Sequence, residues 1–169
     1  VAIAVATPER RRLTFGGLAL ITGAWTLDAL VQALAGTSPW FWSLQHLKLA
    51  VSGHALCPAD EAALADRLSG ALGPCNLKFG QVLASLSPFL LLPMARRFGS
   101  AGWLLAAAAL GGVLLLAGSR ASWITFVLVL AYSGLRQFGW KRLLLLALVA
   151  ALGTAALTAG VPQLRERVA

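Results

Sequence analysis

The chain has 169 residues, of which 59% are hydrophobic and only 12% charged, and its mean hydropathy is +0.79. A typical soluble domain carries about 25% charged residues, so this composition excludes an ordinary soluble globular protein. The net charge of +8 does not indicate nucleic-acid binding, because the basic residues form small clusters between apolar runs and do not cover one polar face. This pattern is typical of an all-α, polytopic membrane protein.

The apolar runs predict a helical bundle of about five spans in a single membrane domain, residues 1–169. The predicted spans are Leu13–Leu34, Phe79–Ala95, Ala101–Ala117, Ala121–Tyr132 and Leu143–Ala159. The fourth is short unless Ser133–Leu135 extend it. An outer loop, residues 36–78, follows the first span, and residues 161–169 begin a second loop on the same side. Because the chain opens on Val1 and closes on a polar stretch, we expect a fragment of a longer protein.

The links between the spans predict the orientation in the membrane, because successive links lie on opposite sides. One side collects eight basic residues within three short segments, Arg10–Arg12, Arg96–Arg97 and Arg136–Arg142. The other side has six, spread over much more chain that also carries acidic residues. The positive-inside rule therefore makes the first side cytoplasmic. Arg120 and the loop 36–78 then face outward, to the periplasm in a Gram-negative cell.

Arg120 lies in the join Gly118-Ser119-Arg120 between the third and fourth spans. A tight turn needs a Gly or a Ser but not this arginine, and an arginine close to hydrocarbon is costly. One interpretation is a side chain that extends along the apolar surface to the lipid phosphates. The other is an anion-binding residue at a membrane-facing site, and the outward orientation favours this second interpretation.

Three more residues are candidates for the same site. Lys78 precedes the second span, where free backbone N–H groups and the helix dipole favour an anion, although an interfacial anchor is an equal alternative. Asp28 and Gln32 are four residues apart and share a face near the outer end of the first span. An acidic residue there should face the bundle interior or water, where it could pair with Arg120 or Lys78.

The outer loop contains several local signals. Trp40-Phe41-Trp42 predicts an interfacial aromatic belt, which we prefer to a sugar-stacking platform. The stretch Ser43–Val51 fits either a short helix on the membrane or an irregular strand. Leucines at every fourth position and a following Gly73 predict a short amphipathic helix over Asp60–Leu72.

Cys57 and Cys75 flank that predicted helix and are the only cysteines of the chain. An oxidising exterior permits a disulfide between them, which is our preferred interpretation. Free thiols remain an alternative, and a metal site with the nearby His54 is a third, although the spacing matches no common metal motif.

Several of these segments together resemble the O-antigen ligase family, which shares a core with O-antigen polymerases and some protein O-oligosaccharyltransferases. The matching stretches are, in order, TLDALVQALAG, RLSGALGPCNLKFG, LSPFLLLP and AGSRASW, within about Leu27 to Val161. The most specific of them is Ser119–Trp123. The family also carries a further arginine and a histidine in a large downstream loop, which this chain does not contain; Arg165 and Arg167 do not match that arginine in position.

The resemblance implies a glycosyltransferase of the bacterial inner membrane with its active face in the periplasm. Members move a glycan from an undecaprenyl-diphosphate carrier to an acceptor, which is lipid A-core in the ligases, without a metal or other cofactor. Arg120 would contact the carrier's diphosphate as the catalytic and substrate-binding arginine. An O-antigen polymerase is the nearest alternative, and a membrane transporter or a scaffold without chemistry are alternatives of another class. The fragment alone would be incomplete for catalysis.

Overall fold

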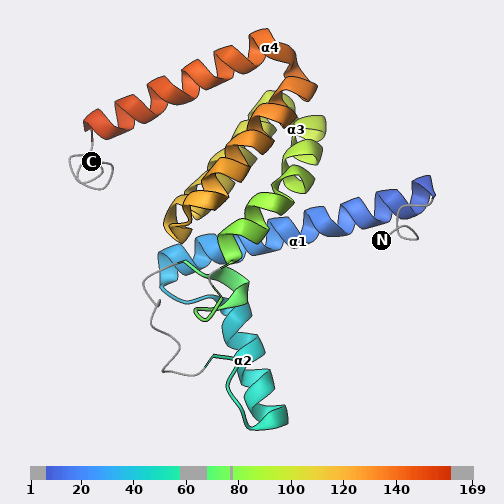
Figure 1. Ribbon diagram of the computed structural model, residues 1–169, viewed down its shortest axis with the longest axis vertical. Coiled ribbons are helices and arrows are strands. Elements are labelled where there is room, and N and C mark those ends of the chain that lie inside the picture. The colour runs from blue at the N-terminus through green and yellow to red at the C-terminus, as the bar shows by residue number, and fades with distance from the viewer. Residues whose placement is uncertain (1–6, 58–67, 77, 161–169) are drawn as a thin grey trace. The chain divides into compact units, whose positions relative to one another are not determined.

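The computed structural model describes residues 7–57, 68–76 and 78–160, and the regular structure in these residues is helical (Figure 1). In chain order the elements are α1 (Pro8–Ala35), α2 (Pro39–Ser52), the 3-10 turn η2 (Gly70–Leu72), α3 (Phe79–Ala117) and α4 (Arg120–Gly160). They divide into two compact units, Val1–Leu130 and Ala131–Ala169, and each is described by itself below.

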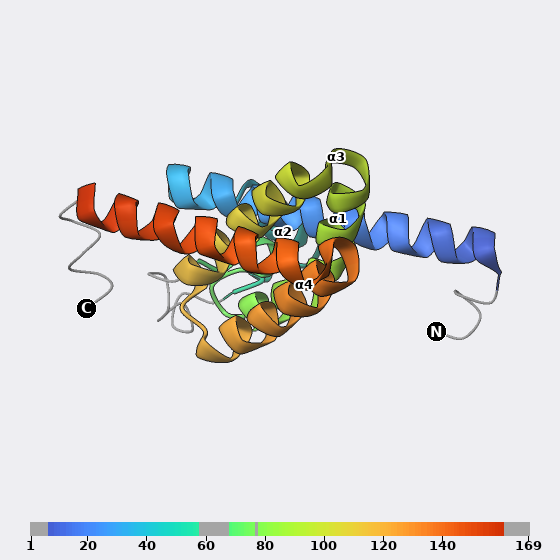
Figure 2. The same cartoon turned by 90° about the horizontal axis from the view of Figure 1, so that it is seen from above.

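The all-helical prediction is confirmed, and α1 and α3 are both long and apolar enough to cross a membrane. Figure 2 shows α1 as one uninterrupted helix. By contrast, α3 is broken at Gly99, which has φ 64° and ψ −148°. This conformation is accessible in practice only to glycine. The break falls in the predicted link after Arg96–Arg97, so α3 contains two helical segments where the sequence predicts two.

The chain reverses direction at Gly99. A Cβ atom placed on Gly80, near the start of α3, would lie 3.5 Å from the Cβ of Ala117 at its end. A Cβ on Gly111 would likewise lie 3.5 Å from the ring of Phe126 in α4. The second half of α3 therefore returns beside the first, and α4 begins at the same end of the unit at which α3 begins. Arg120 and the first turn of α3 are neighbours for this reason.

Helices α1 and α3 pack against each other in antiparallel directions. The rings of Phe15 and Phe89 lie 5.6 Å apart, and the Thr22 hydroxyl donates to the Leu86 carbonyl at 3.4 Å. Pro88 lacks the N–H that would bond the Ala84 carbonyl. The buried Ser87 hydroxyl donates to that carbonyl instead, at 2.6 Å, so the proline leaves no buried acceptor unpaired there.

Helix α2 shows that Ser43–Val51 is helical, which the sequence left open. It starts at Pro39 with Ser38 as its N-cap, and Trp40 and Trp42 are 51% and 60% exposed. Helix α1 begins five residues before the predicted Leu13, because Thr7 caps it and Pro8 occupies its first turn.

The prediction of a helix over Asp60–Leu72 is wrong for residues 68–72. Residues 60–67 lie outside the described residues. Leu68 and Ser69 are not helical, and Gly70–Leu72 form a 3-10 turn. The reason is that backbone N–H groups needed for an α-helix bond elsewhere. The Leu68 N–H donates to the Leu116 carbonyl at 3.4 Å and the Gly70 N–H to the Gln32 side chain at 2.7 Å.

The second unit begins within α4 at Ala131. The helix continues past Tyr132 and breaks at Gly139, where φ is 73° and ψ is 168°, before it resumes to Gly160. The helix that contains the fourth predicted span thus continues through Ser133–Leu135, and the second break again lies in a predicted basic link. The predicted second outer loop, residues 161–169, lies outside the described residues.

Candidate functional site

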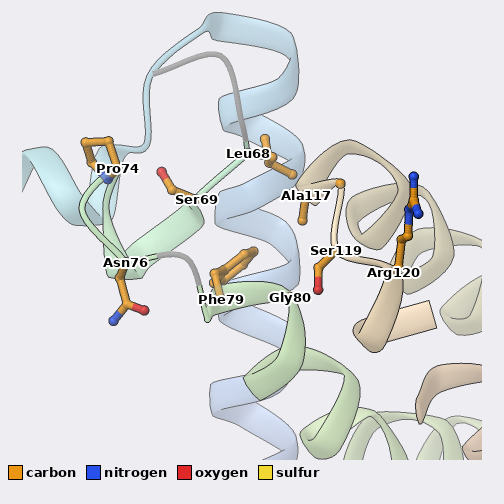
Figure 3. A pocket seen from close by; sticks show the side chains of 10 residues that line it. Leu68, Ser69, Pro74, Asn76, Phe79, Gly80, Ala117, Ser119 and Arg120 are labelled. Atoms are coloured by element: carbon orange, nitrogen blue, oxygen red, sulfur yellow. The ribbon is translucent and has the colours of Figure 1, made fainter. Parts of the chain in front are cut away.

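A pocket of about 330 Å³ lies where α3 begins and where the α3–α4 link passes beside it (Figure 3). Its lining comes from three stretches: the loop before α3, the first turn of α3, and the link that ends in Arg120. The residues are Leu68, Ser69, Pro74, Asn76, Phe79, Gly80, Ala117, Gly118, Ser119 and Arg120. All of them belong to the first compact unit.

The N-terminus of α3 forms one side of this pocket. Lys78 is its N-cap residue, as the sequence predicts, and its side chain makes no capping hydrogen bond. The Lys78 N–H donates to Asn76 Oδ1 at 3.0 Å, and the first intrahelical bond joins the Val82 N–H to the Lys78 carbonyl. The N–H groups of the first turn therefore have no side-chain partner among the described residues, and they carry the positive end of the helix dipole.

The N-terminus of α4 forms a second side. Gly118 ends α3 in the left-handed conformation with φ 66°, and α4 starts at Arg120. Ser119 bonds α4 only through its carbonyl, which accepts from the Trp123 N–H at 3.4 Å. No described side chain caps the first turn of α4. Two uncapped helix N-termini thus meet at one pocket, a geometry that attracts anions.

Cationic side chains add to this positive field. Arg120 lines the pocket and is exposed, and Figure 3 shows its guanidinium directed away from the loop residues Ser69 and Asn76. Lys78 is exposed and precedes the pocket residue Phe79, but it does not line the pocket itself. Neither pairs with Glu9 or Asp28, the two carboxylate residues within the described part of the chain. Within residues 7–57, 68–76 and 78–160, neither cation is therefore held by a carboxylate.

The expected pairing of Asp28 with Arg120 or Lys78 is wrong. Asp28 is buried, and its carboxylate accepts from the Ser38 hydroxyl at 2.7 Å and from the Trp40 N–H at 2.9 Å. Only a short turn separates the end of α1 from α2, so the carboxylate is placed beside the free N–H groups at the start of α2. Asp28 stabilises that helix start and does not line the pocket.

Gln32 acts one turn further along the same face of α1. Its side chain accepts from the Gly70 N–H at 2.7 Å and donates to the Ser69 hydroxyl at 3.4 Å. Gly70 has φ 52°, and any Cβ there would collide with the ring of Phe79. Gln32 is thus outside the pocket, but it fixes the backbone of the loop that forms the pocket side at Ser69.

Cys57 and Cys75 are joined by a disulfide, with their Cα atoms 5.7 Å apart. Cys75 lies between the pocket residues Pro74 and Asn76. The bond therefore ties the pocket loop to the segment that follows α2. In the described parts of the chain no three His, Cys, Asp or Glu side chains gather, so these parts offer no cluster of metal ligands.

Sequence reasoning selected Arg120 and Lys78 but missed other residues of this site. Asn76, Gly80 and Ser119 all lie at the pocket, and none was a candidate. Ser119 had a signal in the join Gly118-Ser119-Arg120, and Asn76 and Gly80 lie in the stretch RLSGALGPCNLKFG, but neither signal named them as ligand-binding residues. Gly80 could not be found from the sequence, because its role depends on residues about 40 positions away in α4.

Comparisons with protein-family models, with curated proteins and with solved structures find no match to this chain. The fold and site therefore define a class by geometry alone. In its described residues the protein is all-helical, with two candidate membrane helices and a pocket built from two uncapped helix N-termini and an arginine.

Proposed function

We propose that this pocket binds the diphosphate group of a lipid-linked glycan. We further propose that the protein acts as an inner-membrane glycosyltransferase of the O-antigen ligase type. The carrier would be undecaprenyl diphosphate, the acceptor lipid A-core, and the pocket would open to the periplasm. The observation that carries the proposal is the meeting of two uncapped helix N-termini and Arg120 at one pocket.

The charge distribution supports a phosphate-type ligand. Helix N-termini attract anions through free N–H groups and aligned peptide dipoles. A guanidinium adds a fixed fork of donors that fits two phosphate oxygens, and it stays protonated at any physiological pH. Arg120 also has no carboxylate partner among the described residues, so a ligand would displace none of these to reach it.

The same arrangement suits glycan transfer. When the bond between the sugar and the diphosphate breaks, negative charge grows on the leaving oxygen. Donors already aimed at that position stabilise the transition state without reorganisation. In this mechanism Arg120 and the first-turn N–H groups of α3 and α4 bind the leaving group, while the acceptor attacks from a side that these residues do not form. An O-antigen polymerase would use the pocket in the same way, because it shares the donor.

The test is glycan transfer by membranes that contain the natural protein or its Arg120→Ala variant, with undecaprenyl-diphosphate-linked glycan as donor. We expect the variant to lose nearly all transfer while its abundance in the membrane is unchanged, since removal of an interfacial charge eases insertion. Normal transfer at normal abundance would refute the proposal. A second comparison with lipid A-core or a second lipid-linked glycan as acceptor separates ligase from polymerase.

A further inference from the structure

Ser122, in the first turn of α4, carries a hydroxyl that the fold leaves unused. The residue is fully buried, and its Oγ is the one buried side-chain oxygen without a hydrogen-bond partner among the described residues. Buried polar groups in folded proteins are almost always paired, so an orphan hydroxyl needs an explanation, such as a ligand or water that completes it.

The position of this hydroxyl points to the pocket. A Cβ atom placed on Gly80 would lie 2.8 Å from Ser122 Oγ, and Gly80 belongs to the pocket lining (Figure 3). The missing side chain at Gly80 therefore gives the hydroxyl room to pack against a residue of the pocket lining, although Ser122 itself does not line the pocket. The hydroxyl also lies between the first turns of α3 and α4, whose free N–H groups point toward the same region.

We propose that the Ser122 hydroxyl is a further binding group of the pocket, which donates a hydrogen bond to a diphosphate oxygen seated against Gly80. The proposal rests on the anion site described under Proposed function. It adds a neutral donor beside Gly80 to the cation of Arg120. Gly80 is required because a Cβ atom there would lie 2.8 Å from Ser122 Oγ and would displace the hydroxyl from this position.

Isothermal titration calorimetry on the detergent-solubilised chain tests this assignment, with inorganic pyrophosphate and farnesyl diphosphate as separate probes. Ser122→Ala should weaken binding about tenfold, which corresponds to about 1.4 kcal/mol. Equal loss with both probes indicates recognition of the diphosphate itself. Binding of farnesyl diphosphate alone, weakened in the same way, also supports the assignment and restricts the source to a lipid-linked diphosphate.

Ser87→Ala is the matched control, because Ser87 is equally buried but already bonded to the Ala84 carbonyl. We expect Ser87→Ala to lower the thermal unfolding midpoint and leave diphosphate affinity unchanged. Ser122→Ala should weaken diphosphate binding and leave the thermal unfolding midpoint unchanged, because it removes a hydroxyl that stabilises nothing in the folded chain. A lower unfolding midpoint with unchanged affinity in Ser122→Ala would overturn the assignment and make the hydroxyl structural.

Gly80→Ala gives an independent check through a double-mutant cycle. Its Cβ would meet Ser122 Oγ, but it would lie 3.5 Å from the Cβ of that residue, so the double variant with Ser122→Ala has room to fold. If Gly80 acts by leaving room for the hydroxyl beside the pocket, the two losses of affinity should not add. Fully additive losses would contradict the proposed role of Gly80.

These measurements separate the two proposals. If the unaltered chain binds neither probe, the anion site itself is refuted and the Ser122 assignment falls with it. If the chain binds diphosphate and Arg120→Ala weakens it while Ser122→Ala does not, the anion site stands and only the Ser122 assignment is refuted.

Discussion

The start of α2 differs from the starts of α3 and α4 in how its backbone N–H groups are bonded. The start of α2 is closed: the Ser38 hydroxyl accepts from the Phe41 N–H at 3.1 Å, and the Asp28 carboxylate accepts from Ser38 and from the Trp40 N–H. The starts of α3 and α4 are open, since no described side chain caps either first turn. The same kind of backbone group is thus satisfied within the fold in one region and left free in the other.

The difference shows which helix starts are stabilised by polar side chains of this chain and which are not. A helix N-terminus closed by an acidic side chain has no net attraction left for an anion, whereas an open one keeps it. Asp28 therefore supports the structure around the pocket and takes no part in the charge of the pocket. The two open helix starts, with Arg120 beside them, form the region that is suited to bind an anion.

The largest loss of stability should follow removal of the disulfide, which ties the pocket loop to the segment after α2. Replacing Cys57 and Cys75 together by serine should cost about 3 kcal/mol of stability, because the bond closes a loop between residues 18 apart in sequence. Thermal unfolding of the purified protein with and without reductant measures this cost. Reductant should lower the midpoint of the native protein and leave that of the double variant unchanged; equal midpoints throughout would show that the bond contributes nothing.

Removal of Arg120 should affect the open region and little else. Arg120→Ala should weaken pyrophosphate binding about 100-fold, as expected for two charged hydrogen bonds, and Arg120→Lys about tenfold, because an ammonium keeps the charge but not the fork. Calorimetric titration gives both values. Arg97→Ala is the matched control, since Arg97 is also exposed but lies near the Gly99 break. A similar loss of pyrophosphate affinity in Arg97→Ala would show that the effect of Arg120→Ala comes from the change in net charge and not from a contact with the ligand.

Asp28→Ala sharpens the comparison from the other side. It should destabilise the protein by about 1–2 kcal/mol through loss of the α2 cap, while diphosphate affinity changes less than about threefold. Glu9→Ala, at the exposed start of α1, should change stability by less than about 0.5 kcal/mol. The readouts are the thermal midpoint and the calorimetric affinity. A large loss of affinity in Asp28→Ala would return Asp28 to the set of ligand-binding residues.

The sequence predicts the helical segments well, because hydropathy and glycine positions report local structure. The breaks at Gly99 and Gly139 fall in the predicted basic links. The start of α1 was missed although Thr7 and Pro8 are recognised start signals, since the apolar run begins later. The Asp60–Leu72 helix was overpredicted at its end because Gln32 and Leu116, both distant in sequence, take the N–H groups that the helix would need.

The site was predictable only where charge marks it. Arg120 and Lys78 stand out in an apolar chain, and both lie at or beside the pocket. The roles of Asp28 and Gln32 were not predictable, because their partners are set by how the outer loop folds back on α1. The contact between Gly80 and Ser122 leaves no trace in the sequence, since it arises from the reversal of α3.

The central claim is that a diphosphate occupies the pocket between the two open helix ends, and cysteine protection tests it most directly. Ser119→Cys places a thiol on the pocket lining, and Ser43→Cys places one on the exposed surface of α2. At a pyrophosphate concentration about ten times the dissociation constant, labelling of the thiol at position 119 by a neutral maleimide should slow about tenfold. Labelling at position 43 should not change. Unchanged labelling at position 119 under saturating pyrophosphate, or equal slowing at both positions, would contradict the account.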